Sequence, residues 1–180
     1  MTRPDRRPAR TRAALMDAFV AALLEDGYDA VSVEAIAARA NVGRSTFYTH
    51  FKGKDDITRQ ALARPSAVLA ALAAGTLSKE ALERQLAHFH EQRRRNRMFF
   101  EPPLRAIWVG CLAQLIEPLL RRKDLLLPAP LAARQVAEGQ IALIANWLLL
   151  RPQTKVETIA RALTAQTLAT VAALGHDGMS

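Results

Sequence analysis

The sequence predicts an all-α fold, and three observations support this prediction. Alanine and leucine dominate the chain, and both are strong helix formers. Half of the 180 residues are hydrophobic, which is enough to bury a substantial core, and only 8 are glycines. Apolar residues also recur at intervals of three and four, the spacing of one helix face. We therefore expect helices throughout, arranged in one or two small domains.

The first segment, residues 1–11, is predicted to be a flexible basic arm. It is rich in arginine, and Pro4 and Pro8 discourage a helix there. Such an arm can be an electrostatic anchor or a solvated tail, and the sequence leaves both open. A helix is then expected from Arg12 to Asp26, ending at Gly27.

Two short helices joined by a tight turn are predicted between about residues 32 and 51. Ser32 is a good N-cap for the first of them. Asn41 and Gly43 lie in the turn, and both residue types tolerate the left-handed backbone that a sharp reversal needs. In the second helix, Phe47 and the phenylalanine four residues later fall on one side, which we expect to face the core.

The opposite face of this second helix is polar and basic. Arginine can grip guanine bidentately, and hydroxyl groups can reach bases or phosphates. Lysines at and beyond the end of the helix suit phosphate contacts. This is the layout of a helix-turn-helix motif that enters a DNA groove, and the alternative is a helical hairpin with a merely solvated face. The face collects Arg44, Ser45, Tyr48, Thr49 and Lys52, with Thr46 at its margin and Lys54 just beyond.

The stretch from Leu15 through Asp56 resembles the N-terminal domain of the TetR family of bacterial transcriptional regulators. The resemblance rests on three elements: Gly27-Tyr28, Ser32-Val33-x-x-Ile36-Ala37, and Thr46-Phe47-Tyr48-x-His50-Phe51-x-x-Lys54. Gly43 and Asn41 depart from the serine and glycine that the family usually has, and both remain compatible with the turn.

The resemblance implies a division of labour among the polar residues. Ser32 and Lys54 are implied to touch phosphates, whereas Arg44, Ser45, Thr46 and Tyr48 are implied to approach bases. The predicted DNA-binding residues are therefore Ser32, Arg44, Ser45, Thr46, Tyr48, Thr49, His50, Lys52 and Lys54.

The remaining chain is predicted to be a helical regulatory and dimerisation domain, residues 57–180, following a DNA-binding domain at residues 12–56. A helix begins near Lys54, and Pro65 is expected to kink or interrupt it. After Gly75 no motif is comparably sharp. The expected later helices are 78–95, 104–122, 131–150 and 154–174.

The last two predicted helices suggest dimerisation, because each carries two apolar faces. The resemblance implies that this pair packs against its symmetry mate in a two-fold homodimer. The alternative is that both faces are buried within one chain. The predicted interface residues are Val136, Gln140, Ile141, Ile144, Leu148, Ile159, Leu163 and Thr167.

The resemblance also implies a small-molecule cavity among the middle helices, whose occupant would weaken DNA binding by linkage. The candidate lining residues could equally be ordinary core. They are Leu69, Leu72, Leu86, Phe89, His90, Phe99, Trp108, Cys111 and Trp147.

Other kinds of site are disfavoured by the sequence. His88 and His90 are two apart on a helix and make a poor metal pair, and no acid orients Cys111 as a nucleophile, so we expect no metal, no cofactor and no enzyme. The net charge of +8 suits a polyanionic partner. The arginine run 93–97 is a solvated helix end or a second anion contact.

These observations lead to one expectation of function. We expect a homodimeric transcriptional regulator that binds an inverted-repeat operator in double-stranded DNA, most simply a repressor released by an unknown small-molecule effector. A ligand-independent architectural DNA-binding factor and a helical enzyme using the central pocket are the alternatives. A single cysteine and the lack of a visible signal peptide or apolar span predict a cytoplasmic protein without membrane contact.

Overall fold

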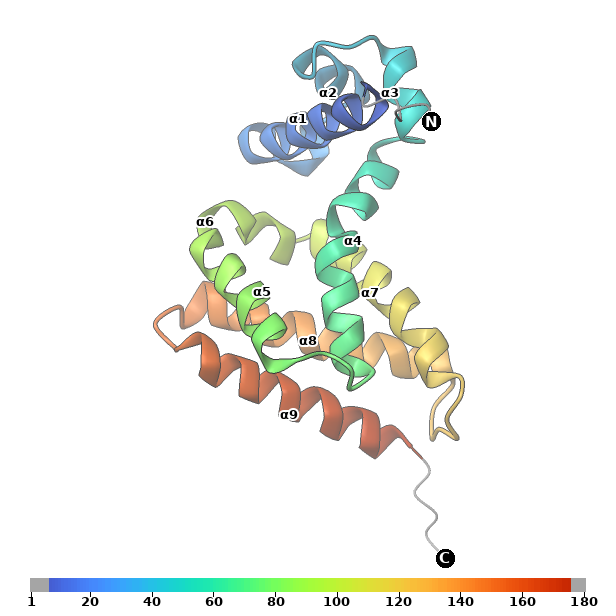
Figure 1. Cartoon of the computed structure of the whole chain (residues 1–180), viewed down its shortest axis with the longest axis vertical. Helices are drawn as coiled ribbons and strands as arrows, with labels where there is room; N and C mark the ends of the chain where they lie inside the picture. Colours follow the sequence, from blue (N-terminus) through green and yellow to red (C-terminus); the bar gives the residue numbers. More distant parts are fainter. Residues whose placement is uncertain (1–6, 176–180) are drawn as a thin grey trace, which may run out of the picture. The chain divides into compact units, whose positions relative to one another are not determined.

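The computed structural model describes residues 7–175, and the predicted all-α fold is confirmed (Figure 1). These residues form nine α-helices and one short 3-10 helix, with a single isolated bridge between Leu125 and Gly175. The chain divides into two compact units, residues 1–61 and 62–180. The division falls five residues after the expected domain end at residue 56, within a helix that runs through it.

The N-terminal unit contains α1 (Arg7–Ala30), α2 (Val33–Arg39), α3 (Arg44–His50) and the start of α4 (Lys54–Ala73). α1 packs on α2, and α2 packs on α3 (Figure 1). Their apolar faces meet in a core whose members include Leu15, Phe19, Leu23, Ile36, Phe47, Phe51 and Ile57.

The start of α1 differs from the predicted flexible arm. The helix begins at Arg7, so residues 7–11 are helical, and residues 1–6 of the arm lie outside the described part of the chain. Pro8 is tolerated because it lies in the first turn, where its missing N–H would have no partner within the helix. Gly27 interrupts the helix as predicted, with φ 76° and ψ 164°, although one further turn follows before Ala30.

The second unit contains the rest of α4 followed by α5 (Lys79–Glu91), α6 (Arg93–Asn96), the 3-10 helix η1 (Arg97–Phe100), α7 (Leu104–Leu120), α8 (Ala129–Leu150) and α9 (Val156–Leu174). α8 packs against both α7 and α9, and α5 also lies along α9 (Figure 1). The helix predicted to reach residue 95 ends at Glu91, because the backbone at Gln92 (φ −97°, ψ 17°) leaves the helical region.

Pro65 was expected to kink or interrupt α4, and it does not interrupt it. The helix is continuous from Lys54 to Ala73 with Pro65 inside it. A proline removes one hydrogen bond, here to the carbonyl of Ala61, but the turns on either side keep theirs. The helix ends at Ala73. Gly75, two residues beyond, has a φ of 70° that permits the hydrogen bond from Thr76 N to Ala71 O.

The eight predicted dimer-interface residues are buried within the single chain. All eight side chains are buried, none more than 7% exposed. The apolar stripes of α8 and α9 therefore face the core of their own unit, and they cannot also meet a partner. The residues that were predicted at the interface and are buried instead are Val136, Gln140, Ile141, Ile144, Leu148, Ile159, Leu163 and Thr167.

Between residues 7 and 175, no single helix is long and apolar enough to cross a membrane. One bent pair of segments, Arg93–Phe100 with Leu104–Leu120, meets the length and composition criteria together, with a bend of 78°. Trp108, Leu112 and Ile116 of this pair are buried in the core of the unit.

Candidate nucleic-acid interface

The turn between α2 and α3 is fixed by backbone hydrogen bonds around Asn41. Asn41 adopts the left-handed conformation, with φ 53°, as its residue type predicted. Its N–H donates to Ala38 O at 3.0 Å, and the N–H of Val42 donates to Ala37 O at 3.0 Å. This pair of bonds is the Schellman arrangement, which satisfies the last carbonyls of α2 and sets the direction of the chain into α3.

The two helix starts in the motif are capped differently. Ser32 is extended, and its Oγ accepts a hydrogen bond from Ala35 N at 3.1 Å, as expected of an N-cap. Gly43 is the N-cap of α3, with φ −71° and ψ 154°. Of the two turn residues, Asn41 alone takes the left-handed backbone, and Gly43 occupies the capping position of α3.

α3 is divided into a buried face and an exposed face. Phe47 and Phe51 are fully buried with ring centroids 5.6 Å apart, so the predicted core side is confirmed. Tyr48 is 48% exposed, although a tyrosine could have turned into the core. Among the nine predicted DNA-binding residues, Ser32, Arg44, Ser45, Tyr48, Thr49 and Lys52 are exposed, while Thr46, His50 and Lys54 are partly buried.

Arg44 is held by two neighbours on the exposed face. Its Nη1 lies 2.7 Å from Glu34 Oε1, while its Nη2 donates to the hydroxyl of Tyr48 at 3.5 Å. The guanidinium also lies 5.7 Å from the centroid of the Tyr48 ring. These contacts hold Arg44 beside Tyr48, and the Tyr48 hydrogen bond together with the Glu34 charge raises the pKa of Arg44. The sequence analysis did not predict the ion pair between Glu34 and Arg44. The two residues lie ten apart on either side of the predicted turn, and this spacing was the available signal.

Lys54 has an internal role in addition to its predicted phosphate contact. Its Nζ donates to Tyr28 O at 3.0 Å and lies 4.4 Å from the centroid of the Tyr28 ring. The Tyr28 hydroxyl donates in turn to Asp55 Oδ1 at 2.9 Å, and burial followed by this bond raises the pKa of Tyr28. The lysine therefore joins the end of α1 to the start of α4 while leaving two of its three N–H donors for other partners.

The segment after α3 is also tied to α4. Asp56 Oδ2 accepts a hydrogen bond from Lys52 N at 2.8 Å, and Oδ1 accepts one from Gln60 Nε2 at 3.0 Å. These bonds lower the pKa of Asp56 below the usual carboxyl value. The backbone of Lys52 is thereby fixed, while its side chain stays exposed and available for a phosphate.

Arg12 of α1 contacts residues at the end of α3 and in α4. Its guanidinium lies 5.3 Å from the centroid of the Phe51 ring and donates a hydrogen bond to Gln60 Oε1. α1, α3 and α4 are thus joined around one aromatic residue. The exposed face of α3 is presented by a rigid support, which is what sequence reading by a helix requires.

Residues 15–61 match the family model described as bacterial regulatory proteins, tetR family. A 64-residue segment is 36% identical to the HTH-type transcriptional regulator YxbF of Bacillus subtilis strain 168. Residues 15–61 therefore form a TetR-type N-terminal domain. The model for these residues describes a family of bacterial regulatory proteins. The match to YxbF covers 35% of this chain and 17% of that protein's length.

Solved structures share the fold over nearly the whole chain. A TetR-family regulator from Streptomyces coelicolor A3 matches with a TM-score of 0.67 and 22% identity, covering 96% of this chain and 99% of the other. The SmeT–triclosan complex matches with a TM-score of 0.58 and 18% identity, covering 93% of each chain. At these identities the likeness concerns the fold.

In the second unit, the nine residues predicted to line a ligand cavity do not form one group. Leu69, Leu86 and Trp108 are fully buried core. Phe89 packs edge-on against Trp108, with ring centroids 5.7 Å apart, while Phe99 is partly buried at the edge of the core and Cys111 is half-buried on α7. Only Trp147 and Leu72 line the two hollows described on this unit, and they line different ones.

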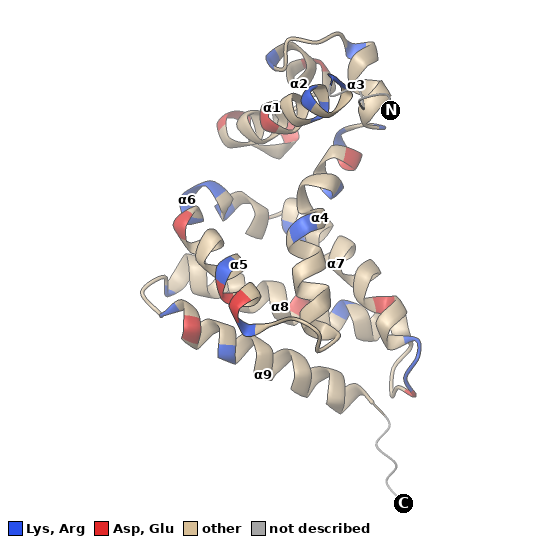
Figure 2. Cartoon of the chain, viewed as in Figure 1, with Lys and Arg blue, Asp and Glu red and all other residues tan. Residues whose placement is uncertain are grey.

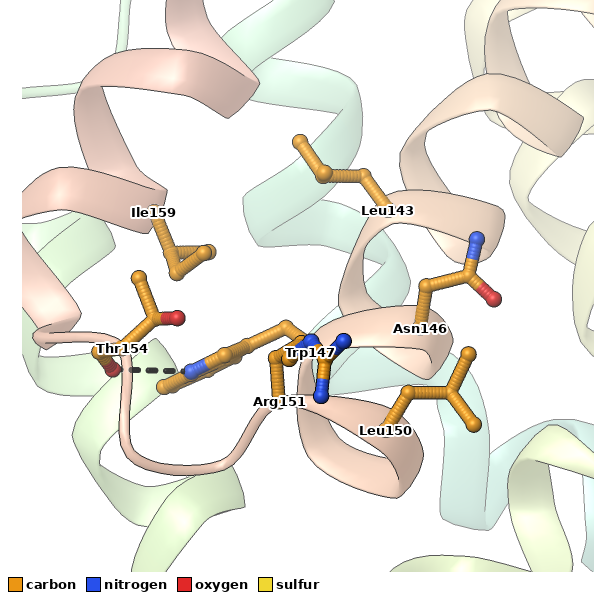
Figure 3. A pocket seen from close by; sticks show the side chains of 7 residues that line it. All are labelled: Leu143, Asn146, Trp147, Leu150, Arg151, Thr154 and Ile159. Carbon is orange, nitrogen blue, oxygen red and sulfur yellow. Dashed lines mark hydrogen bonds between the residues drawn. The ribbon is translucent and has the colours of Figure 1, made fainter.

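The two hollows differ in size and lining. One has a volume of about 370 Å³ and lies among α4, α5 and α9, with Leu72, Lys79 and Arg161 in its wall. The other has a volume of about 570 Å³ and lies where α8 turns into α9, with Trp147 in its wall (Figure 3). Both fall near the size range of small-molecule sites.

The remaining candidate groups have ordinary surroundings. His90 stacks on Trp147 and its Nε2 lies 2.7 Å from Pro152 O, while His88 is exposed. No group of three or more potential metal ligands occurs between residues 7 and 175. The arginine run 93–97 forms α6 and the first residue of η1 (Figure 2), and Arg97 pairs with Glu101 at 2.8 Å.

Proposed function

We propose that this chain is a sequence-specific repressor, which reads an inverted-repeat operator in double-stranded DNA as a homodimer and releases it when a small molecule binds. The observation that carries the proposal is the exposed polar face of α3. Arg44, Ser45, Tyr48 and Thr49 stand on that face, while Phe47 and Phe51 anchor the opposite face in the core.

The surroundings of α3 support a reading role. An arginine can form two hydrogen bonds to one guanine, and a tyrosine or serine hydroxyl can reach a base or a phosphate. Arg44 is already held beside Tyr48 and needs only to exchange Glu34 for DNA. Lys52 and the remaining donors of Lys54 are placed for the phosphate backbone at the end of the helix.

The DNA-reading part is tested by selecting random DNA fragments with the full chain at two salt concentrations. We expect an enriched inverted repeat that survives the higher salt, because base contacts persist when phosphate contacts weaken. Arg44→Ala and Tyr48→Ala should each cost roughly 1–3 kcal/mol of operator binding. Arg122→Ala, an exposed arginine of the second unit, is the matched control. Unchanged affinity in both α3 variants would refute the assigned reading face.

The proposed dimer uses the outer faces of α8 and α9 instead of the buried stripes. Leu131 and Leu149 lie on one side of α8 and are 54% and 37% exposed, while Leu168 of α9 is 42% exposed. Ala165 and Ala172 lie on the exposed side of α9, and such small side chains let helices approach closely. Two-fold pairing would place two α3 helices on successive turns of DNA, about 34–36 Å apart or a multiple of that.

Sedimentation equilibrium of the full chain tests this arrangement. Leu149→Glu should shift the population from dimer toward monomer, because a charge would be buried at the interface. Leu126→Glu is the control, since Leu126 is 58% exposed in the segment between α7 and α8. A wild-type chain that sediments as a monomer would contradict the proposal.

The effector part of the proposal draws on the fold comparison, because SmeT is a chain of the same fold that holds triclosan. A ligand that favours a dimer shape unable to bind the operator lowers the affinity of the protein for DNA. By linkage, DNA must lower the affinity of the protein for the ligand by the same factor. Titrating the operator complex with candidate compounds measures this coupling. Operator binding that no compound changes would favour the ligand-independent factor.

A further inference from the structure

A hollow of about 570 Å³ lies at the junction of α8 and α9. Figure 3 shows Leu143 and Ile159 on one side of it and Trp147 with Arg151 on the other. Leu150, 65% exposed, leaves the hollow open to solvent on the α8 side. We call this hollow the α8–α9 groove. It is lined by Leu143, Asn146, Trp147, Leu150, Arg151, Thr154 and Ile159.

The turn that forms the floor of the groove is held by two aromatic side chains. Trp147 Nε1 donates to Thr154 O at 2.9 Å (Figure 3). His90, reaching from α5, lies 2.7 Å from Pro152 O through its Nε2. The two rings stack with centroids 5.3 Å apart and planes 15° apart. The wall is thus set before any ligand arrives, which lowers the entropic cost of binding.

The groove has an apolar interior and one cation at its edge. Leu143, Leu150 and Ile159 supply aliphatic surface. Arg151 is exposed, and no carboxylate of residues 7–175 lies within 4.0 Å of its guanidinium. By contrast, Arg105 and Arg121 of the same unit are paired with glutamates. The groove therefore offers a fork of N–H donors beside an aliphatic wall.

We propose that the α8–α9 groove binds a small molecule with an aliphatic body and a carboxylate. The body lies against Leu143, Leu150 and Ile159, and the carboxylate accepts hydrogen bonds from Arg151. A guanidinium matches the two oxygens of a carboxylate with two parallel N–H donors. The volume of the groove falls within the range of sites that hold ligands of this size.

The test is isothermal titration calorimetry of the full chain with octanoate and with octanamide. The two compounds share a tail and differ in charge. We expect octanoate to bind roughly three- to tenfold more tightly, because Arg151 is exposed and its ion pair is partly screened. Arg151→Gln should remove the difference between the compounds, and Leu143→Ala should weaken both. Arg122→Gln and Leu126→Ala are the matched controls outside the groove.

Several outcomes would overturn the proposal. Octanoate that fails to bind, or that binds wild-type and Arg151→Gln proteins equally, would show that the groove does not recognise a carboxylate. Octanoate that binds only after Leu149→Glu has dissociated a dimer would show that a second copy fills the groove.

The titration contains no DNA, so its outcome is independent of the proposed repressor function. Only the regulatory consequence, a lowered operator affinity in octanoate, rests on that function. If the fragment selection enriches no motif while octanoate still binds, the proposed repressor function is refuted and the proposed carboxylate site is retained. If the protein binds an operator but not octanoate, the proposed carboxylate site is refuted and the proposed repressor function is retained.

Discussion

Replacing Lys54 by methionine should destabilise the N-terminal unit in addition to weakening DNA binding. The Lys54 ammonium donates to Tyr28 O at 3.0 Å and lies 4.4 Å from the Tyr28 ring centroid. Methionine keeps the apolar stem but removes the charge and the donors. The carbonyl that remains still accepts from Val31 N at 3.3 Å, so it is not left wholly without a partner.

The expected loss follows from the two contacts. A hydrogen bond to a charged group contributes about 1.5–3 kcal/mol when well buried, and a cation–ring contact contributes about 0.5–1 kcal/mol at an exposed site. Lys54 is only partly buried, which reduces both contributions. We therefore expect a loss of about 1–2 kcal/mol in the free energy of unfolding. For a unit of this size, each kcal/mol corresponds to roughly 4–8 °C in Tm.

The aromatic residues allow this to be measured in the full chain. Both tyrosines, Tyr28 and Tyr48, belong to the N-terminal unit, whereas both tryptophans, Trp108 and Trp147, belong to the second. Thermal unfolding followed by tyrosine absorbance should shift in Lys54→Met, while tryptophan fluorescence should not. Lys52→Ala is the control, because we expect its loss to reduce only DNA affinity and the slope of its salt dependence, by about 1. Equal tyrosine transitions in Lys52→Ala and Lys54→Met would refute the structural role of Lys54.

Two further predictions concern the same unit and the same tyrosine readout. Asn41→Val should cost about 1–2 kcal/mol of unfolding free energy, since a β-branched residue resists φ 53°. Gly43→Ser should stabilise α3 by about a few tenths of a kcal/mol, because a side chain there meets only Ser45 Oγ at 3.7 Å. A destabilised Gly43→Ser variant would show that this space is not available. Asp56 has a lowered pKa, so its stabilising effect is complete above the unfolded value of about 3.9 and is lost as pH falls through the lower folded value. The stability gap between wild type and Asp56→Asn should therefore be constant near neutral pH and close in acid, and a gap that persists at low pH would contradict this assignment.

The sequence predicted the helix-turn-helix well because its determinants are local. An N-cap serine, a left-handed asparagine and two phenylalanines four apart depend on neighbours within a few residues, and all took their expected places. Local rules failed where position within a helix decides the effect. Pro8 was expected to prevent a helix and Pro65 to kink or interrupt one. Pro8 instead lies in a first turn, and Pro65 lies inside a helix that continues through it.

The residues that line the two hollows could not be predicted, because a cavity depends on packing and not on composition. Phe89, Phe100 and Trp108 fill the space between α5, η1 and α7 with edge-to-face and tilted contacts. The same residues with slightly different helix positions would leave a cavity. The groove lies instead beside Trp147, where the α8–α9 turn leaves a gap that no periodicity encodes.

The predicted interface residues are buried for a specific physical reason, which also locates the outward face of α8. Gln140 and Thr167 were assigned to the interface as polar members of apolar stripes. In the structure, Gln140 Nε2 donates to Leu69 O at 3.1 Å and to Thr167 Oγ1 at 3.2 Å, joining α4, α8 and α9 inside one chain. A polar side chain within an apolar stripe can be buried when it has a hydrogen-bond partner inside the chain, because burial without such a partner costs free energy. The outward face of α8 must lie about half a turn away from Gln140, where Leu131 and Leu149 follow one another about five turns apart. Any symmetric partner has to meet that face, since the other is already filled.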